Sequence, residues 1–376
     1  MKSKNKLCPV TQWNFGVIWI AVLASMSVCI PEDEKPYLPI TSTPMVVFTP
    51  TQTLTAPTAY PALSTQEQML SPTMDPDHWT FYPQAAHLTR GQVNMIKQAP
   101  DGAMWFMAGV GLTRFRDNVW TSYPINELFG LSERTRFAFT PDGDLWIGSE
   151  KGVFRFDGDT WTQYTIVDGL VSNDVTALDA SSDGIVWIAH PAGISMYDGE
   201  CWMPYPSFIP RTDVIVHQIV AADDGIVWFG LSNGEVFRFD GEHWTSKTVG
   251  ISVSKMALSP DGSLWVVAVK ENRGVWDVEL VHIIGDLVVH YAHPLLSWAP
   301  ITELAISDDM SVWITELSKF GVVKFAGERW MTLYGDEMGD KYTEQYLDFN
   351  GAFSICEDRA GALWIGTVSG VYRYMP

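Results

Sequence analysis

The stretch Asp142–Trp161 reads DGDLWIGSEKGVFRFDGDTW. It holds two Asp-Gly pairs and two further glycines, Gly148 and Gly152, and short apolar runs lie between the turns. Asp-Gly pairs favour the tight turns that join neighbouring antiparallel strands. We therefore expect this part of the chain to form four short strands, at residues 136–140, 145–149, 153–156 and 160–165.

The same pattern recurs along the chain. An apolar residue followed by tryptophan returns at spacings of 41, 41, 41, 37, 48 and 51 residues. These tryptophans are Trp105, Trp146, Trp187, Trp228, Trp265, Trp313 and Trp364. A period of 40–50 residues with several short strands per unit is typical of a β-propeller, which has one four-stranded blade per repeat. The sequence predicts an all-β, seven-bladed propeller in which these tryptophans pack between blades.

The two ends of the repeat region predict how the ring closes. The seventh repeat ends at GVYRYMP, one strand short, whereas HWTFYP at 78–83 resembles the fourth strand VWTSYP at 119–124. We expect the N-terminal strand to complete the last blade, because ring closure removes exposed sheet edges.

The fifth repeat departs from this pattern. VKENRGVWDVELVHIIGDLVVHYAHP predicts a longer connection between its second and third strands. It also lacks the closing tryptophan, with Val289 or a neighbour in that place. Insertions in repeat arrays fall in loops, often on the binding face.

Two segments precede the propeller, which we place at 77–376. Residues 1–30 carry three lysines before an apolar run at 15–30, which is typical of a secretory signal. MSVC at 26–29 resembles a bacterial lipobox, although Met26 and Val28 depart from it, and this makes Cys29 a candidate for lipidation. An uncleaved anchor and a cleaved signal peptide are the alternatives, and each places the rest outside the cytoplasm. Residues 31–76 are rich in proline and threonine and predict a disordered, extended stalk.

The net charge of the chain excludes some classes of binding partner. The formal net charge is −20, and such an acidic protein repels nucleic-acid phosphates and anionic membrane faces. We therefore expect no nucleic-acid partner, and contact with a membrane only through the N-terminal anchor.

The repeats resemble a known family. DGDLWIGSEKGVFRFDG, GALWIGTVSGVYRY and DGIVWFGLSNGEVFRFDG are similar to the two-component regulator propeller repeat. That family is best known as the periplasmic sensor portion of bacterial hybrid histidine kinases. The resemblance implies an extracytoplasmic sensor propeller of a bacterial protein. We expect a stand-alone exported protein without a kinase, whose signalling would pass through a second protein.

The sequence contains neither HExxH nor a phosphate-binding loop, and hairpin turns explain its Asp-Gly pairs without calcium. GLSNG at 230–234 has the letters of GxSxG, but it belongs to the repeat DGIVWFGLSNGEVFRFDG and not to the strand-to-helix turn that this motif requires. We expect a non-enzymatic protein without metal or cofactor. A lyase similar to streptogramin lyase, which is a propeller using histidine and magnesium, is a distant alternative resting on His190 and His217.

Propeller topology predicts a ligand face. The loops between second and third strands, and those between blades, share one face around the channel mouth. That face gathers ten candidate ligand-binding residues: Arg90, Arg134, Asn173, Asp174, His190, Arg211, Asp213, Trp298, Glu316 and Tyr342. Mixed polar groups with aromatics suit a small ligand such as a glycan or a peptide. The alternative from another class is a scaffold that binds a protein of the cell envelope.

Overall fold

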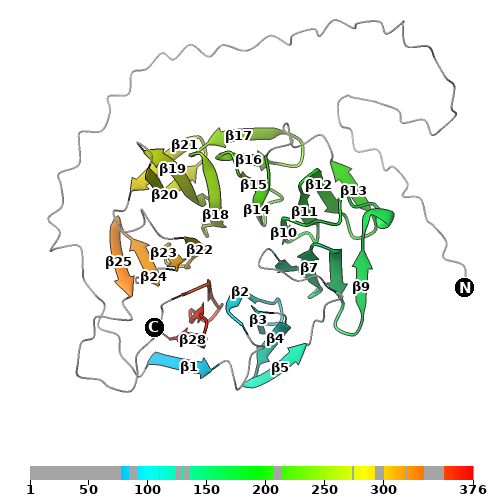
Figure 1. The fold of residues 1–376 in the computed structure, drawn as a ribbon, viewed down its shortest axis with the longest axis horizontal. Helices are drawn as coiled ribbons and strands as arrows, with labels where there is room; N and C mark the ends of the chain where they lie inside the picture. The colour runs from blue at the N-terminus through cyan, green and yellow to red at the C-terminus, as the bar shows by residue number, and fades with distance from the viewer. Residues whose placement is uncertain are drawn as a thin grey trace, which may run out of the picture. The chain divides into compact units, whose positions relative to one another are not determined.

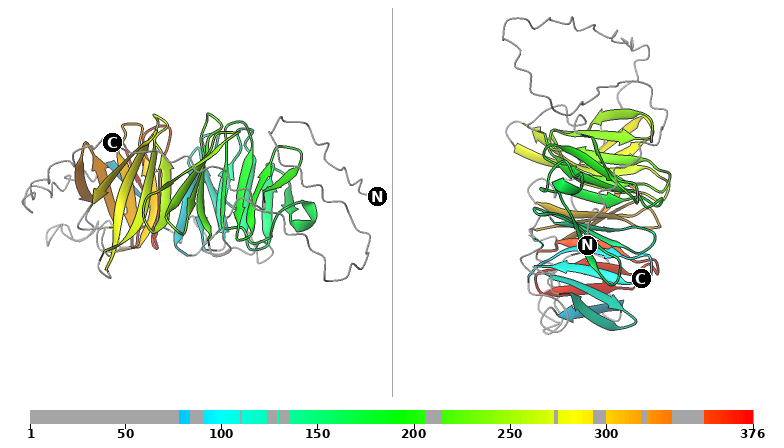
Figure 2. Two further views of the ribbon diagram at one scale, coloured as in Figure 1. Left: turned by 90° about the horizontal axis from the view of Figure 1, so that it is seen from above. Right: turned by 90° about the vertical axis from the view of Figure 1, so that its right-hand side faces the viewer.

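A computed structural model of the chain describes residues 78–83, 91–109, 111–123, 129, 135–205, 214–272, 275–292, 300–317, 321–333 and 351–375. These residues form seven antiparallel four-stranded sheets arranged around a centre (Figure 1). Seen from the side, the strands run between the two faces of this ring (Figure 2). The predicted seven-bladed β-propeller is therefore confirmed.

The first three blades follow the chain in order from the centre outward. Blade 1 comprises β2 (Val93–Gln98), β3 (Met104–Ala108), β4 (Gly111–Arg116) and β5 (Val119–Tyr123). Blade 2 comprises β6 (Arg136–Phe139), β7 (Leu145–Ser149), β8 (Gly152–Phe156) and β9 (Trp161–Tyr164). After the 3-10 turn η3 (Ile166–Asp168), blade 3 comprises β10 (Ala177–Ala180), β11 (Val186–His190), β12 (Gly193–Tyr197) and β13 (Trp202–Tyr205).

The next three blades repeat this order. Blade 4 comprises β14 (Val216–Ala221), β15 (Val227–Leu231), β16 (Glu235–Phe239) and β17 (Trp244–Thr248). Blade 5 comprises β18 (Ser252–Leu258), β19 (Leu264–Asn272), β20 (Val275–Ile284) and β21 (Leu287–Ala292). Blade 6 comprises β22 (Ile301–Ile306), β23 (Val312–Glu316), β24 (Val322–Ala326) and β25 (Arg329–Leu333).

Blade 7 is built from both ends of the chain. Its inner strands are β26 (Ser354–Glu357), β27 (Leu363–Gly366) and β28 (Gly370–Tyr374), and its outermost strand is β1 (Trp79–Pro83). The pairing runs from Trp79 opposite Tyr374 to Pro83 opposite Gly370. The predicted closure by the N-terminal strand is confirmed.

The quoted stretch forms blade 2 nearly as expected. The turn between β7 and β8 depends on Gly152, whose φ is +109°. A Cβ at this position would lie 2.3 Å from the backbone oxygen of Tyr164. Glycine satisfies both constraints, since it has no Cβ and tolerates positive φ.

The seven repeated tryptophans are distributed one to each of seven apolar clusters, and each cluster joins two neighbouring blades. Their side chains are between 1% and 8% exposed. In blade 2, for example, Trp146 packs against blade 3, whereas Trp161 packs against the cluster shared with blade 1. Each blade therefore covers the tryptophan of the blade before it.

The fifth blade differs from the prediction. Its extra residues do not lengthen a loop but extend the β19–β20 hairpin, whose pairing continues to Asn272 opposite Val275. The segment is rich in valine, and β-branched side chains favour the extended strand over an open loop. The insertion therefore produces strands of 9 and 10 residues.

The signal segment at 1–30 with Cys29, the stalk at 31–76 and residues 334–350, which precede blade 7, lie outside the described residues. Among the residues that are described, no helix has the length and apolar character needed to cross a membrane.

Candidate functional site in the central channel

Four of the ten predicted ligand-binding residues are described. They are Asn173, Asp174, His190 and Glu316. The other six lie outside the described residues: Arg90, Arg134, Arg211, Asp213, Trp298 and Tyr342.

Asn173 and Asp174 precede the innermost strand of blade 3. The Asn173 side-chain oxygen accepts a hydrogen bond of 2.9 Å from the Ile166 backbone N–H and so holds the η3 turn. Asp174 is half-buried, and its Oδ1 atom has no hydrogen-bond partner within the described part of the chain. Both residues therefore lie at the entrance of blade 3, and the Asp174 carboxylate retains an unused acceptor atom.

His190 ends β11 and is fully buried. Its Nδ1 lies 3.2 Å from the Asp174 carbonyl oxygen, and its Nε2 lies 3.0 Å from Ser195 Oγ. A carbonyl only accepts, so Nδ1 carries the proton and the Ser195 hydroxyl donates to Nε2. Burial lowers the pKa of His190 to about 4, against the opposing effect of Asp174. The imidazole is thus neutral and holds β11, β12 and the preceding loop together.

The second histidine of the lyase alternative lies elsewhere. His217 is exposed on β14, and its Nδ1 lies 2.9 Å from the Val253 carbonyl oxygen of blade 5. Among the described residues, no group of three or more His, Cys, Asp or Glu side chains is placed to hold a metal ion.

Glu316 ends β23 and is also fully buried. Its backbone pairs with Ile301 of β22, so Glu316 belongs to a strand and not to a loop. Its side chain is buried in the protein interior. In this state of the protein, His190 and Glu316 are not accessible from the loop face.

The sequence analysis missed a set of charged residues on the innermost strands. Figure 1 shows these strands around the centre of the ring. Five charged residues of these strands interact with one another across blades: Lys97 on β2, Arg136 on β6, Asp179 on β10, Lys255 on β18 and Glu303 on β22. We call this set the channel cluster.

One ion pair of the channel cluster joins blades 1 and 3. Lys97 Nζ lies 3.0 Å from Asp179 Oδ1, and the side chains are 34% and 17% exposed. Asp179 Oδ2 also accepts a hydrogen bond of 3.1 Å from the Ala221 backbone N–H of blade 4. The carboxylate of Asp179 is thus held from both sides.

The other three members share one carboxylate. Lys255 Nζ lies 3.7 Å from Glu303 Oε2, and the charge of Glu303 also attracts Arg136. Burial lowers the pKa of Arg136, and burial together with the nearby Arg136 charge lowers the pKa of Lys255. Lys255 retains 15% exposure although protein surrounds it, as expected for a group that faces a narrow channel. The carboxylate of Glu303 therefore interacts with two partly desolvated cations, and Arg136 also donates a hydrogen bond of 3.0 Å to the Thr135 carbonyl oxygen.

Cys356 on β26 lies opposite Trp364, the same register position that Lys97 and Asp179 occupy in their blades. Burial raises the pKa of its thiol to about 12, against the opposing effects of a backbone hydrogen bond and of Lys97. The thiol therefore stays protonated and is a poor nucleophile.

The channel cluster has a net positive formal charge, with three cations and two carboxylates, whereas the whole chain carries −20. A positively charged site inside an acidic protein is suited to a small anion, because opposite charges attract more strongly where protein, and not water, surrounds them. This arrangement can bind and orient an acidic group.

The chain is a closed seven-bladed β-propeller, and comparisons identify its repeat. The family model of the two component regulator propeller matches residues 346–369, in the seventh repeat. The resemblance predicted from the sequence is therefore confirmed. Among curated protein sequences, none matches the chain.

Solved structures share the fold at low sequence identity. A catalytically inactive virginiamycin B lyase from Staphylococcus aureus with quinupristin has a TM-score of 0.64 at 13% identity, over 79% of our chain and 99% of the lyase. The extracellular domain assigned to a hybrid two component system of B. thetaiotaomicron has a TM-score of 0.59 at 18% identity. This match covers 79% of our chain and 41% of the other. YCF48 bound to a peptide has a TM-score of 0.55 at 16% identity, over 81% and 98% of the two chains.

Proposed function

We propose that this protein is a non-catalytic, extracytoplasmic binding propeller of sensor type, which recognises a small acidic ligand at its central channel. The observation that carries the proposal is the channel cluster, in which Lys255 pairs with Glu303 and the charge of Glu303 also acts on Arg136. A ligand carboxylate or phosphate would give these cations a second anionic partner, and such charge-assisted contacts are the stronger class of hydrogen bond. An acidic glycan and the C-terminus of a peptide both carry such a group.

The proposed location has two supports. The N-terminal sequence resembles an export signal with Cys29 as a lipidation site, and one structural neighbour is an extracellular domain of a two component system. We expect the chain to be tethered to the membrane at its N-terminus. Changing Cys29→Ser should release the protein from the membrane fraction if the tether is a lipid.

The enzyme alternative is disfavoured by the histidines. His190 is buried and uses both ring nitrogens in structural contacts, whereas His217 bonds to a backbone carbonyl of the next blade. A catalytic base must reach a bound substrate, which His190 does not do. His217 is exposed, but among the described residues no group of three or more His, Cys, Asp or Glu side chains could hold a metal ion as the lyase alternative requires.

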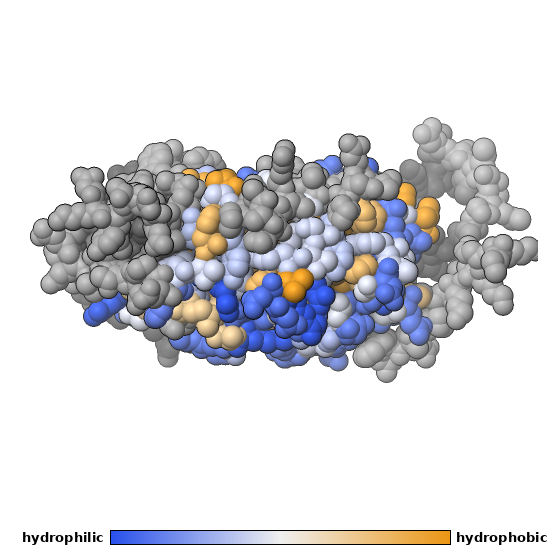
Figure 3. Space-filling view, turned by 90° about the horizontal axis from the view of Figure 1, so that it is seen from below, coloured by the Kyte–Doolittle hydropathy of each residue, from blue (hydrophilic) through white to orange (hydrophobic). Residues whose placement is uncertain are grey.

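The scaffold alternative would require a broad apolar surface. On the rim of the ring shown in Figure 3, the described apolar residues form small groups separated by residues of intermediate or hydrophilic character. The described part of this rim therefore gives no support to a scaffold that binds through it.

The test is a titration of the full-length protein with acidic and neutral oligosaccharides, and with one peptide bearing a free or an amidated C-terminus. A ligand at 100 times its Kd should add about 2.7 kcal/mol to the free energy of unfolding, which thermal shift detects. Arg136→Gln and Lys255→Met should each weaken binding at least tenfold, whereas the exposed Arg116→Gln should not. Equal binding of acidic and neutral ligands, or binding unchanged in both channel variants, would overturn the proposal.

A further inference from the structure

An aromatic pair marks the outer edge of six of the seven blades. The last or next-to-last residue of the third strand is aromatic and pairs with the closing tryptophan of the fourth, and the two ring centroids lie 4.5 to 4.9 Å apart. The pairs are Phe115–Trp120, Phe156–Trp161, Tyr197–Trp202, Phe239–Trp244, Phe325–Trp330 and Tyr374–Trp79. Each pair faces the repeated tryptophan of the preceding blade.

The interface between blades 2 and 3 shows the complete arrangement. The ring of Trp146 stacks on Tyr164 of its own blade, at 5.7 Å between centroids. From blade 3, Tyr197 and Trp202 approach the same ring at 5.1 and 6.0 Å. Trp146 is thus covered by three aromatic rings.

The interface between blades 4 and 5 lacks all three of these rings. Strand register places Lys247 opposite Val236, where blade 2 has Tyr164 opposite Val153. In blade 5 the pair is Ile283–Val288, with the same four-residue connection that separates an aromatic pair elsewhere. The predicted loss of a closing tryptophan is therefore located at Val288, one residue from Val289.

Trp228 is consequently left without aromatic neighbours within the described part of the chain. The Arg238 guanidinium lies over its ring at 5.8 Å from the centroid. Lys247 turns outward, and its Nζ lies 3.1 Å from the backbone oxygen and 3.3 Å from the carboxylate of Asp286. Lys247 takes the place of one missing ring but reaches toward Asp286, and Ile283 and Val288, which take the places of the other two, are smaller than aromatic residues.

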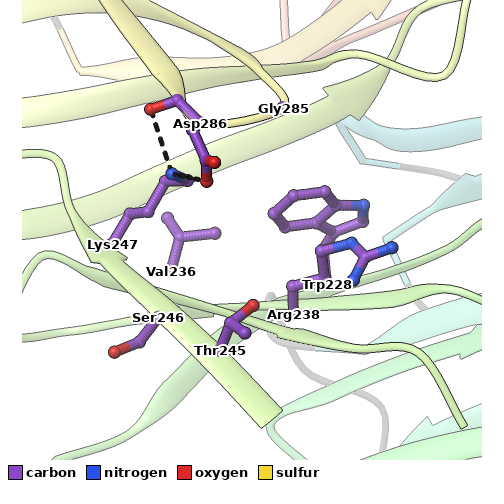
Figure 4. Close-up of a pocket in the computed structure, with 8 residues that line it drawn as sticks. All are labelled: Trp228, Val236, Arg238, Thr245, Ser246, Lys247, Gly285 and Asp286. Carbon is purple, nitrogen blue, oxygen red and sulfur yellow. Dashed lines mark hydrogen bonds and ion pairs between the residues drawn. The ribbon is translucent and has the colours of Figure 1, made fainter. Parts of the chain in front are cut away.

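A pocket of about 370 Å³ lies beside Trp228, where Lys247 takes the register position of Tyr164, and the side chains of Ile283 and Val288 are not among those that line it (Figure 4). Blade 4 contributes Trp228, Val236 and Arg238, and also Thr245, Ser246 and Lys247, while the β20–β21 turn contributes Gly285 and Asp286. Blade spacing is set by the closed ring and by the cluster around Ile283, so smaller side chains leave a void rather than a collapsed interface.

We propose that this pocket binds a small aromatic compound with an acidic substituent. At the equivalent place between blades 2 and 3, aromatic rings pack against the repeated tryptophan, so an aromatic ligand would make the same kind of contact with Trp228. The volume of the pocket suits one ring system. Arg238 and Lys247 stand at its edge. Their present partners leave them available, because Arg238 lies 3.4 Å from Asp240 and the Asp286 side chain is fully exposed, so both ion pairs are weak. The ligand ring lies beside Trp228, and its acidic group pairs with these cations.

The test uses the full-length protein with indole-3-acetate as the probe, followed by ligand-observed NMR and calorimetry. Binding to the unmodified protein is expected. Tryptamine, which carries the opposite charge, and cyclohexaneacetate, which lacks the aromatic ring, should each bind at least tenfold more weakly. Absence of indole-3-acetate binding overturns the proposal, and equal binding of tryptamine or cyclohexaneacetate overturns its charge or its aromatic requirement.

Two variants locate the site. The double change Ile283→Tyr and Val288→Trp rebuilds the aromatic pair and should reduce binding at least tenfold while raising the melting temperature. If that variant fails to fold, Lys247→Tyr alone should still weaken binding. Lys151→Tyr, the same change on an exposed turn of blade 2, should not. Binding unchanged in a folded, filled variant overturns the site. The channel variants should leave this binding intact, so this proposal and that for the channel fail separately.

Discussion

The ammonium of Lys97 on the innermost strand of blade 1 lies 3.0 Å from the carboxylate of Asp179 on the innermost strand of blade 3. The ion pair thus passes in front of blade 2, whose residue at the matching register position is Ala138. A small residue in the intervening blade leaves room for the long lysine side chain to cross the channel. The pair connects blades that are not neighbours.

We expect Asp179→Asn to lower the free energy of unfolding by about 1–2 kcal/mol. Asparagine keeps an oxygen for the Ala221 N–H but leaves the Lys97 charge without its partner in a partly buried place, and the partial exposure reduces the cost. Urea unfolding measures the effect. Asp117→Asn, at a side chain that is 89% exposed, should change stability by less than about 0.5 kcal/mol. A loss at Asp179 no larger than at Asp117 would show that the pair does not stabilise the ring.

The repeated tryptophans should differ in how much they contribute to the free energy of unfolding. Trp146→Ala should cost about 3–5 kcal/mol, which is the usual range for a buried tryptophan. Trp228→Ala should cost roughly 1–3 kcal/mol less, since Trp228 lacks the three rings that surround Trp146 and each aromatic contact adds about 0.5–1.5 kcal/mol. Chemical denaturation of both variants makes the comparison, and equal costs would contradict it.

The sequence predicts the propeller because each blade must present the same apolar surface to its neighbours. Trp146 and Trp187 repeat with their turns, so their periodic spacing is visible without a structure. A break in this pattern in the sequence also identifies the irregular fifth blade. Strand register is needed to assign the position of the missing tryptophan to Val288 and to show that Lys247 replaces a tyrosine.

The channel cluster could not be found in this way. Lys97 and Asp179 occupy the same register position in different blades, but single charges on short strands resemble ordinary solvent-facing residues in a sequence. Their meeting depends on the curvature of the ring. His190 shows the opposite error, because a polar residue at the end of a strand suggests an exposed loop, whereas its hydrogen bonds to Asp174 and Ser195 place it inside.

His190 should make the protein less stable in acid. Its pKa is about 4 in the folded state and 6.5 in the reference state, so the unfolded chain binds more protons between these values. Stability should therefore fall as the pH drops from about 6.5 to about 4, by up to about 3 kcal/mol from this residue. His190→Asn should be less sensitive over this window than the unmodified protein. NMR titration should give an imidazole pKa near 4, and a value near 6.5 would contradict the structural function given to this ring.

Blade closure depends on the strand β1. Deleting residues 1–83 should leave blade 7 with three strands and expose the edge of β28, and it removes the contact between the Trp79 and Tyr374 rings, whose centroids lie 4.8 Å apart. We expect lower stability and self-association, because an unpaired edge invites pairing with another chain. Deleting residues 1–76 keeps β1 and is the matched control. Size-exclusion chromatography and thermal melting compare the two. A monomeric 1–83 deletion with the stability of the control would mean that the ring does not require this strand, and three strands would then suffice for the seventh blade.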